Sequence, residues 1–250
     1  MIFKEAFTAT LRFFLQIIFN LELKDENSYN ARAMNIKEIY TGKLFVKTYC
    51  FRLDEDSIAI VDPGGTDDEL MEYLKLEKAK KLSIMITHGH FDHVGGLAGL
   101  LKVYPESRIY IHKSDSAYLG SNGVAEHIKC FAPIHAERYI KQFEAEYGSF
   151  PEATDIISDG DIVNGFKVIH TPGHTPGSVC YYSAENAVLF SGDTLFYHSY
   201  GRTDLYGGSD AEMAKSLKRI LQLPGQTKVY PGHSSNTTIA AERIALAHFL

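Results

Sequence analysis

The chain has 250 residues, with 25 Lys and Arg against 31 Asp and Glu and a formal net charge of −6. Its 45% hydrophobic and 22% charged residues are typical of a folded globular protein and exclude a disordered or low-complexity chain. The negative charge disfavours nucleic acid as a partner, and no apolar run reaches the roughly 18 residues that span a bilayer. Three Cys without a CxxC pair disfavour a disulfide framework. We therefore expect a cytoplasmic protein with no membrane span, and its oligomeric state stays open.

The first 33 residues differ in pattern from the rest. Phe7 to Phe19 is apolar and helix-like, whereas residues 20–33 are polar without periodicity. Arg12 interrupts the apolar run and no small-residue cleavage site follows closely, which disfavours an export signal. We expect residues 1–33 to form a helical or poorly ordered extension and residues 34–250 to form one domain.

From Ile36 onward, short β patterns alternate with helical ones. We expect strands at Ile36–Tyr40, Leu44–Leu53, Ser57–Val61, Leu82–Thr87, Arg108–Ile111, Phe166–Ile169, Ser178–Tyr182, Ala187–Phe190 and Lys228–Tyr230. We expect helices from Asp67, at Val94–Tyr104, within Ser114–Ser149 (clearest at Ala136–Tyr147), at Asp210–Leu223 and from about Thr237. Thr66 with Glu69 and Ser209 with Glu212 have the spacing of capping boxes. Because hairpin-like strand pairs also occur, we predict an α/β fold with mixed sheets covered by helices.

A cluster of histidines follows the predicted strand that ends at Thr87. The segment His88-Gly-His90-Phe-Asp92-His93 places four potential metal ligands between a strand and a helix. Imidazole nitrogens and a carboxylate suit zinc or a neighbouring divalent transition metal. This spacing therefore predicts a metal site.

Three further ligand candidates share one context, a strand followed by a Gly-containing turn. They are His174, Asp193 and His233. Strand ends that meet at one edge of a sheet would bring these side chains together. Seven ligands are too many for one tetrahedral ion but suit two ions that share a bridging ligand.

These motifs resemble the metallo-β-lactamase superfamily. The segments HGHFDH, HTPGHT, GDTLF and YPGH carry the resemblance, which runs from about Met34 onward. Within the superfamily the chain looks most like the single-domain, glyoxalase II-like hydrolases. It implies a four-layer αββα sandwich of two mixed sheets flanked by helices. It also implies that His88, His90 and His174 hold one metal, that Asp92, His93 and His233 hold the other, and that Asp193 bridges them.

The resemblance implies a dinuclear metal-dependent hydrolase acting on a small molecule. Two divalent ions, with zinc expected and iron the alternative, would activate a hydroxide that attacks a thioester or related ester carbonyl. Asp92 could also accept a proton or orient the water. A mononuclear-iron persulfide dioxygenase and a lactonase are the alternatives within the superfamily, and a carboxylate at the bridging position argues against a β-lactamase.

Three residues outside the ligand set have predicted roles. Asp62, after an early strand, occupies the place of a family Asp that orients a metal ligand, with a turn-forming role as the alternative. Arg202 lies in a Gly-Arg-Thr-Asp segment similar to one in the glyoxalase II-like hydrolases and the dioxygenases. It would bind a substrate carboxylate or pair with Asp204. Tyr200 could shape the substrate pocket.

Overall fold

The structure is a computed structural model that describes residues 34–132, 145 and 149–247. The predicted extension at residues 1–33 and most of the predicted helix at Ala136–Tyr147 lie outside the described residues. No helix in the described part of the chain has the length and apolar character needed to cross a membrane.

Within the described residues, the first sheet has six strands in sequence order. β1 pairs antiparallel with β2 and β2 with β3, whereas β3, β4, β5 and β6 run parallel. The strands are β1 (Lys37–Thr41), β2 (Val46–Arg52), β3 (Ser57–Val61), β4 (Lys81–Met85), β5 (Arg108–His112) and β6 (Asp155–Ile157). β3 is buried at every position, as expected for a strand covered on both faces.

In the described part of the chain the second sheet also has six strands, in the order β12-β11-β10-β9-β8-β7. β10 and β11 are parallel, and the other neighbours are antiparallel. The strands are β7 (Ile162–Val163), β8 (Phe166–His170), β9 (Val179–Ser183), β10 (Val188–Gly192), β11 (Lys228–Pro231) and β12 (Thr237–Thr238).

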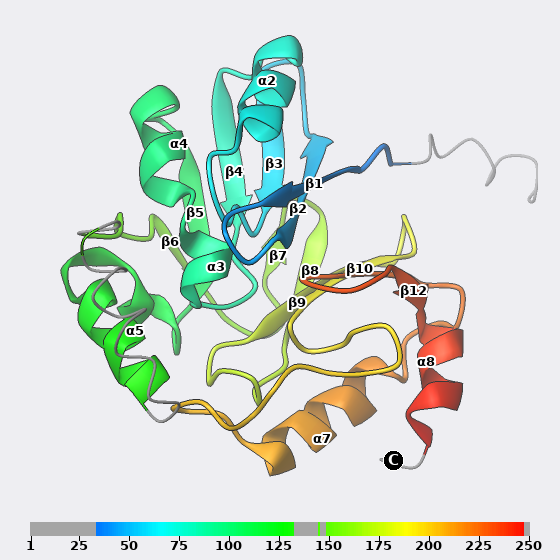
Figure 1. The fold of residues 1–250 in the computed structure, drawn as a ribbon. Helices are drawn as coiled ribbons and strands as arrows, with labels where there is room; N and C mark the ends of the chain where they lie inside the picture. Colours follow the sequence, from blue (N-terminus) through cyan, green and yellow to red (C-terminus); the bar gives the residue numbers. More distant parts are fainter. Residues whose placement is uncertain (1–33, 133–144, 146–148, 248–250) are drawn as a thin grey trace, which may run out of the picture. The chain divides into compact units, whose positions relative to one another are not determined.

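The two sheets pack face to face through aromatic side chains. Tyr49 and Phe51 of β2 contact Phe190 of β10, with ring centroids 5.3 and 5.7 Å apart. Helices cover the outer faces (Figure 1): Leu70 and Leu100, for example, join the core of the first sheet. The helices of that layer are α2 (Asp68–Leu76) and α4 (Leu97–Val103). On the other side α7 (Asp210–Ile220) and α8 (Ile239–Ala245) flank the second sheet. Val124 of α5 (Gly123–Phe131) packs against the core of the first sheet. This confirms the αββα sandwich.

Strand direction explains why the predicted ligands meet. β3 and β4 are parallel, so the segments that follow Val61 and Met85 leave at the same edge of the first sheet. β8 and β10 are both antiparallel to β9, and β10 is parallel to β11, so these three strands also end at one edge. The two edges are joined by a hydrogen bond of 2.8 Å from Val179 N to the Thr87 carbonyl.

Several local expectations need correction. The capping box at Thr66 is wrong: α2 has Asp67 as N-cap without a side-chain cap, because the Asp67 carboxylate accepts from Gly42 N instead. The helix predicted at Val94–Tyr104 begins later, at Leu97, as α4, because the Gly96 amide donates outside the helix to the Pro63 carbonyl. A separate short helix, α3 (Phe91–Val94), precedes it.

The predicted cap of α7 is confirmed, whereas three short strands were missed. Ser209 caps α7 by accepting from Glu212 N, as predicted. The strands β6, β7 and β12 were not predicted, because segments of two or three residues are too short to display an alternating pattern.

Candidate metal centre

The structure brings the seven predicted ligands together at the shared edge of the two sheets. Within the described residues they form three overlapping groups in which the potential ligand atoms lie within 4.8 Å of one another. The groups are His88 with His90 and His174, His88 with His93 and Asp193, and Asp92 with His93 and His233. The two triads that the family resemblance implied are thus present as geometric units.

The first triad is oriented by contacts to its outer ring nitrogens. The Nδ1–H of His174 donates to the Arg202 carbonyl at 2.7 Å, which leaves Nε2 facing the cluster. His88 Nδ1 lies 3.1 Å from Thr87 Oγ1. His90 Nε2 lies 3.3 Å from the buried Cys130 sulfur, so Nδ1 is the nitrogen that remains for a metal. Each histidine thus has one ring nitrogen available to the cluster.

The second triad is oriented by Asp62. Its Oδ2 accepts from His93 Nδ1 at 2.9 Å, which directs His93 Nε2 toward Asp92 and Asp193. His233 Nε2 lies 3.2 Å from Asp92 Oδ2. Asp62 is itself buried and held by Thr87, whose backbone N and Oγ1 donate to its carboxylate at 2.7 and 2.6 Å. The predicted position of Asp62 behind a ligand agrees with these contacts.

Asp193 lies between the two triads. Its Oδ1 is 3.4 Å from His93 Nε2. Its Oδ2 is 3.7 Å from His174 Nε2 and 3.9 Å from His233 Nε2. One carboxylate therefore faces ligand nitrogens of both triads, which is the arrangement that a bridging ligand requires.

Unsatisfied buried atoms provide a test of whether this cluster suits a cation. Buried polar atoms in native proteins nearly always have a hydrogen-bond partner. Here four clustered atoms have none, namely His88 Nε2, His93 Nε2, His174 Nε2 and Asp193 Oδ1. Imidazole nitrogens and carboxylate oxygens that converge without partners fit divalent transition ions such as zinc.

The cluster also shifts the pKa values of its members. Burial, reinforced by neighbouring histidines, holds the pKa of His88 and of His90 well below the ordinary value, so both rings are neutral. Burial alone would lower the pKa of His93, but Asp92, Asp193 and Asp62 outweigh it and raise that pKa. Burial would raise the pKa of Asp92, yet His93 and His233 lower it. Asp92 is therefore a weak proton acceptor and an ionised candidate ligand.

A glycine allows the two ligand edges to approach closely. Gly192 ends β10 with φ of +49°, and a Cβ at this position would lie 2.3 Å from Thr87 Oγ1. Only glycine fits such an approach without displacement. The Gly in the Gly-Asp193 turn therefore has a packing role next to His88.

The structure also locates the two predicted substrate residues. The Arg202 guanidinium forms a bidentate pair with Asp204, with Nε–Oδ1 and Nη2–Oδ2 distances of 2.6 and 2.8 Å. The structure thus contains the predicted alternative in which Arg202 pairs with Asp204, and substrate binding by Arg202 stays a prediction. Tyr200 is half-buried and packs against the core of the second sheet. Sequence reasoning missed the Arg202 carbonyl and Cys130, because a backbone acceptor and a distant thiol carry no local signal.

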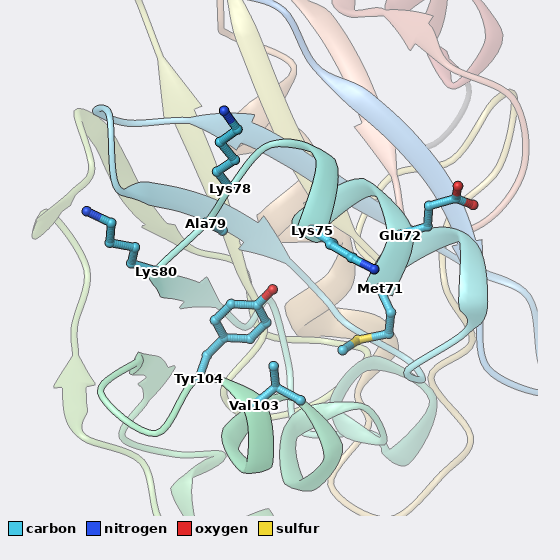
Figure 2. A pocket seen from close by; sticks show the side chains of 8 residues that line it. All are labelled: Met71, Glu72, Lys75, Lys78, Ala79, Lys80, Val103 and Tyr104. Carbon is cyan, nitrogen blue, oxygen red and sulfur yellow. The ribbon is translucent and has the colours of Figure 1, made fainter.

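A separate hollow of about 720 Å³ lies beside α2 and the end of α4 (Figure 2). Its lining includes Met71, Val103 and Tyr104, while Lys78 and Lys80 point away from these side chains. Lys80 directly precedes β4, whereas the ligand loop follows the other end of this strand. The hollow is thus distinct from the metal centre and contains none of its ligands.

The family assignment agrees with the fold and the cluster. The sequence profile of the metallo-beta-lactamase superfamily matches residues 41–233. The chain belongs to this superfamily.

Relatives include proteins named as hydrolases. A "Probable metallo-hydrolase YqgX" of Bacillus subtilis is 30% identical over 214 residues, covering 84% of this chain and 95% of that protein. An "Uncharacterized protein" of Aquifex aeolicus is 37% identical over 219 residues, covering 84% and 94%. A "Hydroxyacylglutathione hydrolase" of Aeromonas hydrophila is 33% identical over 183 residues, covering 72% of this chain and 58% of that protein. The chain is therefore similar to metal-dependent hydrolases.

Two solved structures are similar in fold and sequence. BLEG-1, described as a B3 metallo-beta-lactamase, has a TM-score of 0.71 and 33% identity, covering 84% of this chain and 97% of that chain. TTHA1623 in a di-iron-bound form has a TM-score of 0.68 and 32% identity, covering 82% and 96%. These neighbours confirm the fold class, and the chain is a metal-dependent hydrolase of the superfamily.

Proposed function

We propose that the protein is a dinuclear metallohydrolase that cleaves thioesters or related esters of a small molecule, with residues 34–250 as its catalytic domain. His88, His90 and His174 would hold one ion, Asp92, His93 and His233 the other, and Asp193 would bridge them. The observation that carries this proposal is the position of Asp193, whose two oxygens face His93 on one side and His174 on the other.

Two divalent ions bound there would supply Lewis acidity, activating a water molecule and polarising a substrate carbonyl. The chain's own residues orient the ligands. The Asp62 carboxylate and the Arg202 carbonyl fix the rings of His93 and His174. Because neighbouring histidines lower the pKa of Asp92, we assign this residue to metal binding and water orientation rather than to proton acceptance.

An activity assay tests the proposal. We expect cleavage of S-lactoylglutathione or a chromogenic thioester, and loss of both activity and bound metal in His90→Ala and Asp193→Ala while the fold survives. Asp56→Ala is the matched control, because that carboxylate pairs on the surface with Lys80. Full metal content in Asp193→Ala would refute the bridging role.

β-Lactam hydrolysis also needs a test, because a neighbour with 33% identity is described as a B3 metallo-beta-lactamase. We nevertheless predict weak or no turnover of β-lactams and place thioesters first. Oxygen consumption with glutathione persulfide, without thioester cleavage, would favour a mononuclear-iron dioxygenase. Cleavage of lactones alone would identify a lactonase.

A further inference from the structure

Asp115 is a fully buried carboxylate that lies outside the ligand set. It follows β5, three residues after His112. Its Oδ2 accepts from Gly89 N at 2.8 Å and from Thr175 Oγ1 at 2.7 Å, and its Oδ1 accepts from Gly177 N at 2.6 Å. All three donors are groups of the protein, so the carboxylate is satisfied without a ligand.

The three donors belong to the two loops that carry the first triad. Gly89 lies between His88 and His90 on the loop after β4, while Thr175 follows His174 on the loop after β8. The first loop belongs to one sheet and the second to the other. A single carboxylate thus connects the parts of the first triad that are supplied by different sheets.

Close packing makes this connection specific. A Cβ on Gly177 would lie 2.5 Å from Asp115 Oδ1, so the second loop lies too close to the carboxylate for a side chain at this position. Thr175 Oγ1 is also 2.7 Å from Ser178 Oγ, which restricts the hydroxyl that donates to Asp115. The loop that carries His174 is therefore held at a defined distance from the loop that carries His88 and His90.

We propose that Asp115 is the positioning residue of the first metal site, setting the spacing of His174 from His88 and His90 without touching the ion. The inference rests on the proposed metal centre. The second triad is oriented differently, through the Asp62 contact to His93. Loss of the Asp115 carboxylate should therefore weaken the first site selectively.

The test substitution is Asp115→Asn. An amide side chain has one acceptor oxygen, so in either orientation its NH₂ group faces the backbone N–H of Gly89 or of Gly177. Asp115 contacts the loops and not the ligand rings, and losing a hydrogen bond to a charged group is expected to cost about 10- to 100-fold in the equilibrium that depends on it. We expect an increase of this size in the zinc dissociation constant of the first site.

Single-site backgrounds separate the two ions. His233→Ala retains the first triad and His174→Ala retains the second. In each background, zinc dissociation constants with and without Asp115→Asn are measured by competition with a chromophoric chelator. We expect the increase of about 10- to 100-fold with His233→Ala, and near-unchanged affinity with His174→Ala.

Glu242→Gln is the matched control. Glu242 is also a fully buried carboxylate, and it accepts from His198 N and Thr237 Oγ1 away from the first triad. We expect this substitution to affect both backgrounds alike. Thermal unfolding of the metal-free variants verifies that each is folded. If Asp115→Asn does not fold, Thr175→Val removes one donor and should weaken the first site alone, by about fivefold.

The outcomes distinguish this inference from the proposed function. An equal loss of affinity in both backgrounds would show a merely structural role and overturn the inference. Unchanged affinity in the His233→Ala background would overturn it as well, and either result leaves the dinuclear centre intact. Absence of zinc binding by the unmodified chain would overturn both proposals.

Discussion

Asp62→Asn removes one acceptor oxygen behind the second metal site and should leave the backbone unchanged. Asp62 has a φ of +52°, a backbone conformation that Asn tolerates better than most residues, so the backbone should not change. The Asp62 carboxylate accepts from Thr87 N through Oδ1 and from His93 Nδ1 through Oδ2. Because Asn keeps one acceptor oxygen, it can satisfy Thr87 N or His93, but not both.

The magnitude follows from the lost contact. If the amide oxygen stays with Thr87, its NH₂ group faces His93, and the ring must move or carry its proton on Nε2, the nitrogen directed at the cluster. A hydrogen bond to a charged group contributes about 1.5–3 kcal/mol. At about 1.4 kcal/mol per tenfold change, the affinity of the second site should fall by about 10- to 150-fold.

The assay is zinc competition with a chromophoric chelator in the His174→Ala background, which retains the second triad. Asp56→Ala, a change at a surface carboxylate paired with Lys80, is the control and should leave the affinity unchanged. A second-site dissociation constant that changes less than about threefold in Asp62→Asn would refute the positioning of His93 by Asp62, since typical losses of this kind are about 10- to 100-fold.

Three further predictions concern the loop after Asp193, the His112 ring at the end of β5 and the start of α7. Because the Arg202 guanidinium is paired with Asp204, Arg202→Ala and Asp204→Ala should lower kcat/KM equally for an acidic thioester and its amidated counterpart. A KM increase confined to the acidic substrate, equivalent to about 1.5–3 kcal/mol, would instead identify an anion anchor. Burial, with the stacked His170 ring, lowers the pKa of His112 to about 4 from its ordinary 6.5. Because the folded state disfavours the protonated His112, the free energy of unfolding is not reduced by this residue above pH 6.5, and it decreases as the pH falls toward 4. His112→Asn should flatten the urea-unfolding stability profile across this window, and a profile parallel to that of the unmodified chain would disprove the assignment. Ser209→Ala should lower the free energy of unfolding by about 1 kcal/mol, because Ser209 caps α7; an unchanged urea midpoint would contradict this.

Local patterns predicted mixed sheets covered by helices and the gathering of the ligand loops, whereas the resemblance to the superfamily implied the αββα sandwich. The loop with His88 directly follows an apolar strand, and His174, Asp193 and His233 each follow a strand and a Gly-containing turn. Those features can be recognised without long-range information. Pairs with a local geometric rule, such as Ser209 and Glu212, were also predictable. The absence of a capping box at Thr66 was not predictable, because the Asp67 carboxylate accepts a hydrogen bond from Gly42 N, which is distant in sequence.

The supporting contacts of the centre could not be predicted because they join distant segments. Asp115 lies in an unremarkable polar stretch, and its partners Gly89 and Gly177 are 26 and 62 residues away. The Arg202 carbonyl acts through the backbone, which every residue possesses. Side-chain chemistry thus indicated the ligands, whereas their orientation required the packing of the two sheets.

Metal analysis of protein purified without added metal tests the central claim most directly. The dinuclear proposal rests on Asp193, whose oxygens face both triads, and predicts about two divalent ions per chain, with zinc expected, together with thioester cleavage that a chelator abolishes and restored zinc returns. The metal-free chain should stay folded, because a domain of this size does not depend on the ions for its core. About one iron per chain, with oxygen consumption on a persulfide and no thioester cleavage, would contradict the account.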